Sequence, residues 1–249
     1  MARELHDEIV RQLGEIGFSG RIAYHLNCEP LLDPRLVDFI GEARRACPKA
    51  TVQVTTNGLV LNEDLGRSLF DAGLDCLDIN NYTDQGAWRP NILQFMQAVA
   101  RDAPAPGAID VKTVVRDHPE KTIELFLRDI NATLLNRGGS NPSLTPLLRP
   151  LHTTCLYPFM HIAIGTAGKV GLCCTDFYFD EEMGDLTQTR VVDVWRGERY
   201  REARLLHLGG RRARIALCRR CDSVGYRYTD LEGAPRFLRR LHSRIGYQG

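Results

Sequence analysis

Apolar positions in the first 135 residues follow two alternating periods. Spacings of three and four residues, as at Leu5, Ile9 and Leu13, predict amphipathic helices, whereas short β-branched runs such as 51–56 predict buried strands. Helices are predicted over residues 5–16, 34–46, 65–72, 92–101 and 119–135, and strands over 21–26, 51–56, 76–80 and 109–115. This regular alternation predicts an α/β fold in which helices cover a parallel sheet.

The pattern changes after residue 135. Residues 136–150 are rich in Gly, Pro, Ser and Asn, which predicts a linker between a domain at 1–135 and a second domain at 151–249. The second domain begins with a cysteine-rich module at 151–223. A basic amphipathic helix follows at 236–244, whose charges are better explained as a solvated face than as a surface for nucleic acid or an acidic partner.

Composition narrows the classes of function. The 249 residues carry a net charge of only +1, so no nucleic-acid or anionic-membrane partner is expected. The charged N-terminus has no apolar secretory segment, and no stretch is apolar for long enough to span a bilayer. We therefore expect a cytoplasmic protein, in which the eight cysteines are reduced thiols or metal ligands.

Four cysteines form the most informative pattern: Cys155, Cys173, Cys218 and Cys221. A predicted strand pair runs from Cys155, turns at Gly168-Lys169 and returns to Cys173, and a single C-x-x-C follows at 218–221. Four thiolates around one metal centre suit an iron-sulfur cluster or a structural zinc ion. A zinc site of this kind usually has two C-x-x-C pairs, which favours the cluster.

The surroundings of these cysteines resemble the SPASM, or shorter twitch, domain of radical S-adenosylmethionine (SAM) enzymes. Shared features are Pro158-Phe159, the double Cys173-Cys174, Met183-Gly-Asp-Leu186, Val194-Trp195 and Cys218-x-x-Cys221-Asp222. The resemblance implies that Cys155, Cys173, Cys218 and Cys221 bind a [4Fe-4S] cluster, with Cys174 as an additional candidate. The SPASM pattern continues with further cysteines, and residues 222–249 contain none, so we expect one auxiliary cluster.

Polar residues close the predicted strands of the first domain, where parallel α/β folds bind ligands. They are Asn27-Cys28-Glu29-Pro30, Thr55-Thr56-Asn57-Gly58, Asn80-Asn81-Tyr82 and Arg116-Asp117-His118. The first three groups resemble the radical SAM barrel from its second strand onward. The resemblance implies a partial (β/α) barrel without its first strand, and a SAM site that includes Glu29, Pro30, Thr56, Asn57 and Asn80 or Asn81.

The sequence departs from that family in two ways. Residues 1–249 contain no C-x-x-x-C-x-x-C, the motif that holds the SAM-cleaving cluster. We therefore expect that this chain alone does not initiate radical chemistry, either because a longer protein begins upstream or because the step has been lost. Cys28 replaces the glycine of the Gly-Glu-Pro loop and adds a Cβ and a thiol; it is a candidate cluster ligand, a reactive thiol or a small apolar residue.

Three functional hypotheses follow. The first is a radical SAM oxidoreductase or maturase that acts on a peptide or a small metabolite. The second is a non-catalytic iron-sulfur protein that relays electrons or presents substrate to a complete enzyme, with a homodimer or partner enzyme covering the open edge of the barrel. The third is a zinc-stapled binding module.

Overall fold

The computed structural model describes residues 1–83, 86–105, 108–129, 136–223 and 225. The chain divides into two compact units. Residues 6–134 form the N-terminal unit, and residues 1–5 join 135–249 in the C-terminal unit. The basic helix predicted at 236–244 lies outside the described residues.

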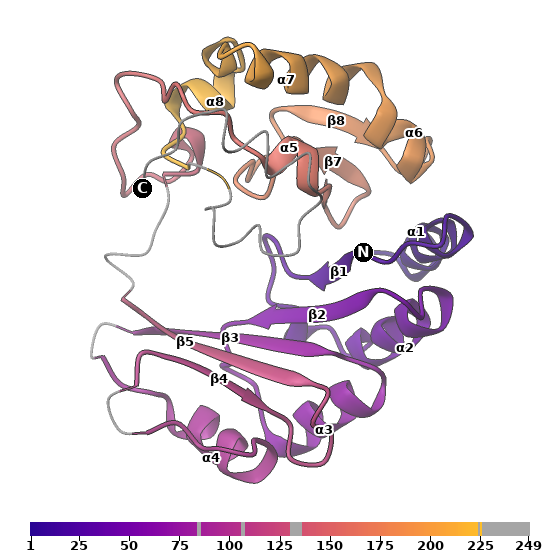
Figure 1. Cartoon of the computed structure of the whole chain (residues 1–249), viewed down its shortest axis with the longest axis vertical. Coiled ribbons are helices and arrows are strands. Elements are labelled where there is room, and N and C mark those ends of the chain that lie inside the picture. Colours follow the sequence, from indigo (N-terminus) through magenta and orange to yellow (C-terminus); the bar gives the residue numbers. More distant parts are fainter. Residues whose placement is uncertain (84–85, 106–107, 130–135, 224, 226–249) are drawn as a thin grey trace. The chain divides into compact units, whose positions relative to one another are not determined.

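The N-terminal unit is built on a five-stranded sheet (Figure 1). Its order is β1 (Arg21–Tyr24), β2 (Thr51–Thr56), β3 (Cys76–Thr83), β5 (Thr122–Asp129) and β4 (Asp110–Val114). The first four strands in this order are parallel, whereas β4 is antiparallel to β5. The helices are α1 (Arg3–Glu15), the short η1 (Pro30–Leu32), α2 (Leu36–Ala46), α3 (Glu63–Asp71) and α4 (Pro90–Val99).

The helix predicted at 119–135 is wrong, because its central part forms strand β5. Ile123 and Leu125 are fully buried while Glu124 between them is half-buried, which is the two-residue period of a strand. A turn at 116–121 folds β5 back onto β4, with Lys121 N donating to the carbonyl of His118 at 2.9 Å. A hairpin therefore replaces the last predicted crossover, and β4 becomes an antiparallel edge strand.

The core of this unit lies on one face of the sheet. Val54, Leu77 and Ile123 alternate into a fully buried cluster with residues of α2, α3 and α4, such as Ile40 and Phe95. These three helices lie together on one side of the sheet (Figure 1). Burial of each such side chain contributes about 1.5–3 kcal/mol. Strand positions of the opposite phase bear mostly polar side chains, with Phe126 as an apolar exception, so the other face of the sheet is chemically distinct.

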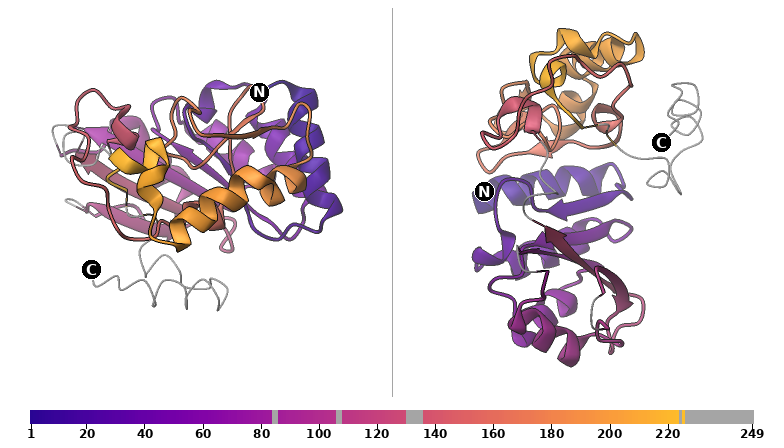
Figure 2. Two further views of the ribbon diagram at one scale, coloured as in Figure 1. Left: turned by 90° about the horizontal axis from the view of Figure 1, so that it is seen from above. Right: turned by 90° about the vertical axis from the view of Figure 1, so that its left-hand side faces the viewer.

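The C-terminal unit combines a small antiparallel sheet with short helices. The sheet consists of β6 (Ala163–Ile164), β7 (Lys169–Gly171) and β8 (Glu182–Asp185). The helices are α5 (Tyr157–Met160), α6 (Val191–Arg196), α7 (Glu198–Leu208), η3 (Arg212–Arg214) and α8 (Ala216–Arg220). Helix α7, orange in Figure 2, contacts α5, α6 and β8. The predicted turn at Gly168 is confirmed, although the helix α5 replaces the first part of the preceding strand.

Residues 136–150, which we expected to be a linker, pack within the C-terminal unit. They begin with η2 (Arg137–Gly139), preceded by Asn136, which is 1% exposed. The Asn136 side chain donates to the carbonyl of Arg220 at 2.8 Å and accepts from the backbone N–H of Asp222 at 3.2 Å. These bonds join the segment directly to the end of α8. None of the helices in the described part of the chain is long and apolar enough to cross a membrane.

Candidate metal centre and cofactor-binding loops

Four sequence-predicted cysteines come together in the C-terminal unit. Cys155 immediately precedes the short α5, Cys173 follows β7, Cys218 lies in α8 and Cys221 ends it. All four are free thiols with 4–6% exposure. Cys173 and Cys218 also belong to a buried apolar cluster with Leu172, Ala203, Ile215 and Leu217. These two thiols therefore pack against apolar side chains.

Burial and mutual repulsion make these thiols hard to ionise. Burial raises the pKa of Cys155 to about 11 and that of Cys173 to about 12, and it also raises the pKa of Cys218. Repulsion among the sulfurs adds to this: Cys218 interacts with Cys155, Cys173 and Cys221. A cation that binds all four removes both penalties, because it displaces the protons and neutralises the thiolates.

The sulfurs are neighbours without converging on one point. The Sγ atoms of Cys173 and Cys221 lie 3.0 Å and 3.9 Å from the hydroxyl oxygen of Thr175. Within the described ranges, no three His, Cys, Asp or Glu side chains enclose a single metal ion. A tetrahedral zinc ion with bonds of about 2.3 Å needs sulfurs about 3.8 Å apart. A cluster places its thiolates on separate irons and thus farther apart.

Two backbone features complete the surroundings of the thiols. The N–H of Ser223 points to the Sγ of Cys221 at 3.4 Å. Gly225 has φ +77°, and a Cβ there would lie 3.0 Å from the Sγ of Cys155, so only glycine fits without displacement. Cys174 is half-buried and interacts electrostatically with Cys155, Cys173 and Cys221, so it borders the same site.

Sequence reasoning missed two residues beside these thiols. His207 of α7 is fully buried, and its Nε2 lies 3.6 Å from the Sγ of Cys218. Burial, together with the nearby Arg212, lowers the pKa of His207 to about 4. Arg212 of η3 is 2% exposed. The only sequence signals were a histidine among apolar helix residues and one arginine in a run of several, and neither distinguishes these residues from ordinary ones.

The second candidate site is the loop after β1. The Glu29 carboxylate accepts hydrogen bonds from the hydroxyl of Thr56 at 2.6 Å, from the N–H of Asn57 at 2.8 Å and from the N–H of Leu31 at 3.1 Å. Pro30, which is buried, begins the short helix η1 that follows. The structure therefore brings Glu29, Pro30, Thr56 and Asn57 together, as the sequence predicted.

The turn after β2 has the backbone that its sequence suggests. Gly58 has φ +72°, and a Cβ there would lie 2.8 Å from Ile92, so the turn requires glycine. Asn57 stabilises the turn, because its side-chain oxygen accepts from the N–H of Leu59 at 2.8 Å. This turn holds the N–H of Asn57 against the Glu29 carboxylate.

The two asparagines of β3 have different roles. Asn81 is fully buried on the helix-covered face, where it donates to the carbonyl of Ala87 at 3.0 Å and accepts from the N–H of Arg89 at 3.2 Å. Asn81 therefore stabilises the segment that leads into α4, which begins at Pro90. Asn80 is half-buried on the polar face and accepts from Arg128 at 3.2 Å. Of the two, only Asn80 lies on the polar face.

A carboxylate occupies the middle of the polar sheet face. Asp78 of β3 is paired in register with Thr55 of β2 and Glu124 of β5. It accepts hydrogen bonds from the Gln53 amide and from the Cys76 thiol, the latter at 3.1 Å. Burial raises the pKa of Asp78, and the charge of Glu124 acts in the same direction. Gln53 is 5% exposed, and its Oε1 has no hydrogen-bond partner among the residues that the structure describes.

Cys28 lies exposed in the loop before Glu29, and partial desolvation of its sulfur raises the pKa of its thiol. Cys47 caps the end of α2 and is 1% exposed, with its thiol directed to the carbonyl of Val10 at 3.8 Å. Cys28, Cys47 and Cys76 belong to the N-terminal unit. They come from three different elements and do not reproduce a clustered ligand motif.

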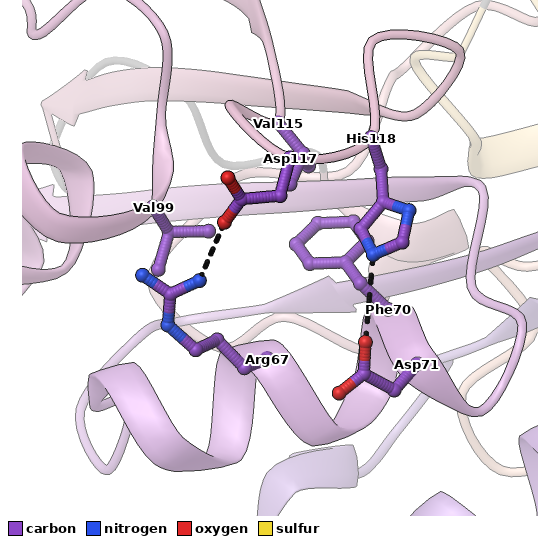
Figure 3. A pocket seen from close by; sticks show the side chains of 7 residues that line it. All are labelled: Arg67, Phe70, Asp71, Val99, Val115, Asp117 and His118. Carbon is purple, nitrogen blue, oxygen red and sulfur yellow. Dashed lines mark hydrogen bonds and ion pairs between the residues drawn. The ribbon is translucent and has the colours of Figure 1, made fainter.

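The fourth predicted group, Arg116-Asp117-His118, lies at the amino end of the parallel strands, opposite to the end that carries Glu29. Because β4 is antiparallel, its last residue, Val114, is paired with Thr122, the first residue of β5. Asp117 and His118 therefore line a pocket with residues of α3 (Figure 3). Arg67 pairs with Asp117 at 2.9 Å, and His118 with Asp71 at 3.4 Å. We expected these residues at the same end of the strands as Glu29, and this expectation is wrong.

Comparison with known proteins finds a matching family model and similar relatives. Residues 155–222 match the SPASM family, an iron-sulfur cluster-binding domain. Over 220 residues, the chain is 26% identical to the S-adenosyl-L-methionine-dependent 2-deoxy-scyllo-inosamine dehydrogenase of Niallia circulans, covering 88% of this chain and 80% of that protein. It is 22% identical to an uncharacterised protein of Treponema pallidum (strain Nichols), covering 89% of this chain and 69% of that protein.

Solved structures extend the comparison to the fold. The crystal structure of BtrN in complex with AdoMet and 2-DOIA superposes with a TM-score of 0.72 and 25% identity, covering 90% of this chain and 81% of that one. An open conformation of BtrN gives a TM-score of 0.63 and 23% identity, over the same shares of each chain. The resemblance to radical SAM proteins with a SPASM domain is thereby confirmed, as is the α/β fold with a mainly parallel sheet.

Proposed function

We propose that this chain is a SAM-dependent iron-sulfur oxidoreductase that dehydrogenates a hydroxyl-bearing small molecule. The observation that carries the proposal is the set of four buried, unbridged cysteines in a domain of the SPASM type. The dehydrogenase from Niallia circulans, similar over most of the chain, supports a small hydroxylated substrate in preference to a peptide.

The site residues fit the required cofactor. Cys155, Cys173, Cys218 and Cys221 would hold one [4Fe-4S] cluster, because they are four buried soft donors and two of them, Cys173 and Cys218, lie in an apolar cluster. When bound, the cluster supplies a one-electron acceptor. Cys174 borders the site and needs no ligand role, since the other four complete the set.

The N-terminal unit would bind SAM and substrate. The Glu29 carboxylate, oriented by the Thr56 hydroxyl and the Asn57 N–H, would accept hydrogen bonds from the methionine ammonium group. On the polar face, Asp78, Glu124 and the unpartnered Gln53 oxygen are acceptors for substrate hydroxyl or amine groups. These assignments make Glu29 a cofactor-binding residue and Thr56 the residue that positions it.

The electron balance shows what such an oxidation requires. Converting an alcohol carbon to a carbonyl removes one hydrogen atom from carbon, one proton from oxygen and one further electron. SAM bound at Glu29 would supply the acceptor for the hydrogen atom, and a cluster held by the four cysteines would supply the acceptor for the further electron. The 249 residues contain no C-x-x-x-C-x-x-C, so the electron that generates the radical is no part of what we assign to this chain.

Metal content tests the first half of the proposal. We expect about four irons and four sulfides per chain in anaerobically purified protein. Cys218→Ala should lose most of the iron, whereas Cys47→Ala removes an equally buried cysteine of the N-terminal unit and should retain it. Zinc at about one per chain without iron would refute the proposal and support the zinc-stapled binding module.

Equilibrium dialysis with labelled SAM tests the second half. Glu29→Gln keeps the shape of the loop and removes the charge, so affinity for SAM should fall about tenfold or more. Glu63→Gln alters an exposed carboxylate of α3 and should bind as the original protein does. A full complement of iron without any SAM binding would contradict the oxidoreductase assignment and favour the electron-relay protein.

A further inference from the structure

Arg212 is a buried cation that has no anionic partner among the described residues. Its side chain is 2% exposed, and its two terminal nitrogens donate to the backbone carbonyls of Thr153 at 3.3 Å and Ser223 at 3.2 Å. Its Nε is buried and has no hydrogen-bond partner in the part of the chain that the structure describes. Within the ranges that the structure describes, no Asp or Glu pairs with it. A guanidinium in this position requires a compensating negative charge nearby.

Arg212 is held beside the four-cysteine site, because its carbonyl partners Thr153 and Ser223 each stand two residues from a candidate ligand, Cys155 and Cys221. Cysteines that bind metal as thiolates would supply negative charge there. The charge of Arg212 acts on both Cys155 and Cys218, where it opposes the effect of burial. Four thiolates around a [4Fe-4S] core leave a net negative charge on the whole group, whichever oxidation state the irons adopt. The buried guanidinium and the four-cysteine site therefore complement each other electrostatically.

His207 adds a directed hydrogen bond to the same site. Its Nδ1 lies 3.3 Å from the backbone nitrogen of Cys155, and a backbone N–H can only donate, so Nδ1 is the acceptor. In the neutral ring the proton is then on Nε2, which lies 3.6 Å from the Sγ of Cys218. The main chain at one candidate ligand thus orients the imidazole N–H toward the sulfur of another.

We propose that Arg212 and His207 are positioning residues that raise the reduction potential of the cluster bound by Cys155, Cys173, Cys218 and Cys221. The inference rests on the proposed function, because it takes the cluster as given and assigns the groups that tune it.

The direction of the effect follows from charge. A reduced cluster carries one more negative charge than the oxidised form, so a nearby cation and an N–H donated to sulfur both stabilise the reduced form. A higher potential makes the cluster a better acceptor for the single electron that remains when an alcohol loses a hydrogen atom and a proton. Both residues would thereby favour substrate oxidation without contacting the substrate.

A potentiometric titration followed by electron paramagnetic resonance tests this, with the full chain purified anaerobically. Arg212→Met should lower the midpoint potential, and Arg212→Lys, which retains the charge, should restore most of the difference. His207→Phe should also lower the potential, whereas His207→Gln, which keeps a donor, should lower it less. Arg214→Gln removes an exposed charge from the same short helix and should leave the potential unchanged.

The outcomes separate this inference from the proposed function. Iron-loaded Arg212→Met and His207→Phe with unaltered potentials would overturn the inference and leave the proposed function intact. If Arg212→Met does not load iron, a normal potential in Arg212→Lys together with a lowered potential in His207→Phe would support it. Original protein that contains zinc and no iron would overturn the proposed function and the inference with it.

Discussion

Thr56→Val tests whether the cofactor loop depends on one buried hydroxyl. Thr56 is 3% exposed at the end of β2, and valine has nearly the same shape. The hydroxyl donates to the Glu29 carboxylate at 2.6 Å and accepts from the N–H of Gly58 at 3.0 Å. The substitution removes both bonds and leaves the apolar packing in place.

The expected cost follows from these two bonds. A hydrogen bond to a charged group contributes about 1.5–3 kcal/mol, and a neutral one about 0.5–1.5 kcal/mol. Glu29 keeps its bonds from Asn57 and Leu31, so the carboxylate stays partly satisfied. We therefore expect the free energy of unfolding of the N-terminal unit to fall by roughly 2–4 kcal/mol.

Urea unfolding followed by circular dichroism measures this change. Thr51→Val, at the exposed start of the same strand, is the matched control and should alter stability by less than about 0.5 kcal/mol. Affinity for SAM should also fall in Thr56→Val, because Glu29 loses the group that orients it. A loss of stability below about 0.5 kcal/mol would show that the hydroxyl does not organise the loop and would refute the reasoning.

The sequence was sufficient for the chemistry that depends on composition and spacing. The four cysteines are recognisable from residue type and interval alone, and the structure places them together. Glu29 and the Thr56-Asn57-Gly58 turn were likewise predictable, because parallel strands bring their carboxyl ends to one edge of a sheet.

Features that depend on strand direction or phase could not be read in the same way. Residues 119–135 have the length and composition of a helix, yet Ile123 and Leu125 fit the sheet core only as a strand. Because β5 forms a hairpin with β4, β4 is antiparallel to it, and Asp117 lies at the opposite end of the strands from Glu29. The choice between Asn80 and Asn81 similarly depended on phase, since a shift of one residue exchanges the two faces of a sheet.

Long-range contacts define the residues that sequence reasoning missed. His207 reaches the backbone of Cys155 across 52 positions, and Arg212 donates to Thr153 across 59. Neither interval forms a motif, and a buried arginine is unexpected from residue type alone. Only the folded chain shows that the two side chains lie beside the cysteines.

Two further predictions concern the polar sheet face. Burial raises the pKa of Cys76 to about 12, so at pH 8 its thiolate fraction should be about a thousandfold below that of a free thiol. Iodoacetamide labelling with peptide mass mapping should therefore find Cys76 almost unmodified, and rapid labelling would contradict this. Burial also raises the pKa of Asp78, so between its ordinary value and the raised one the native state binds this proton more tightly than the unfolded chain. Stability must then decrease as the pH rises through that window, because ionised Asp78 is disfavoured in the folded state. Asp78→Asn should consequently increase stability to urea at pH 7 more than at pH 4, and an equal or larger gain at pH 4 would exclude desolvation of Asp78 as the cause.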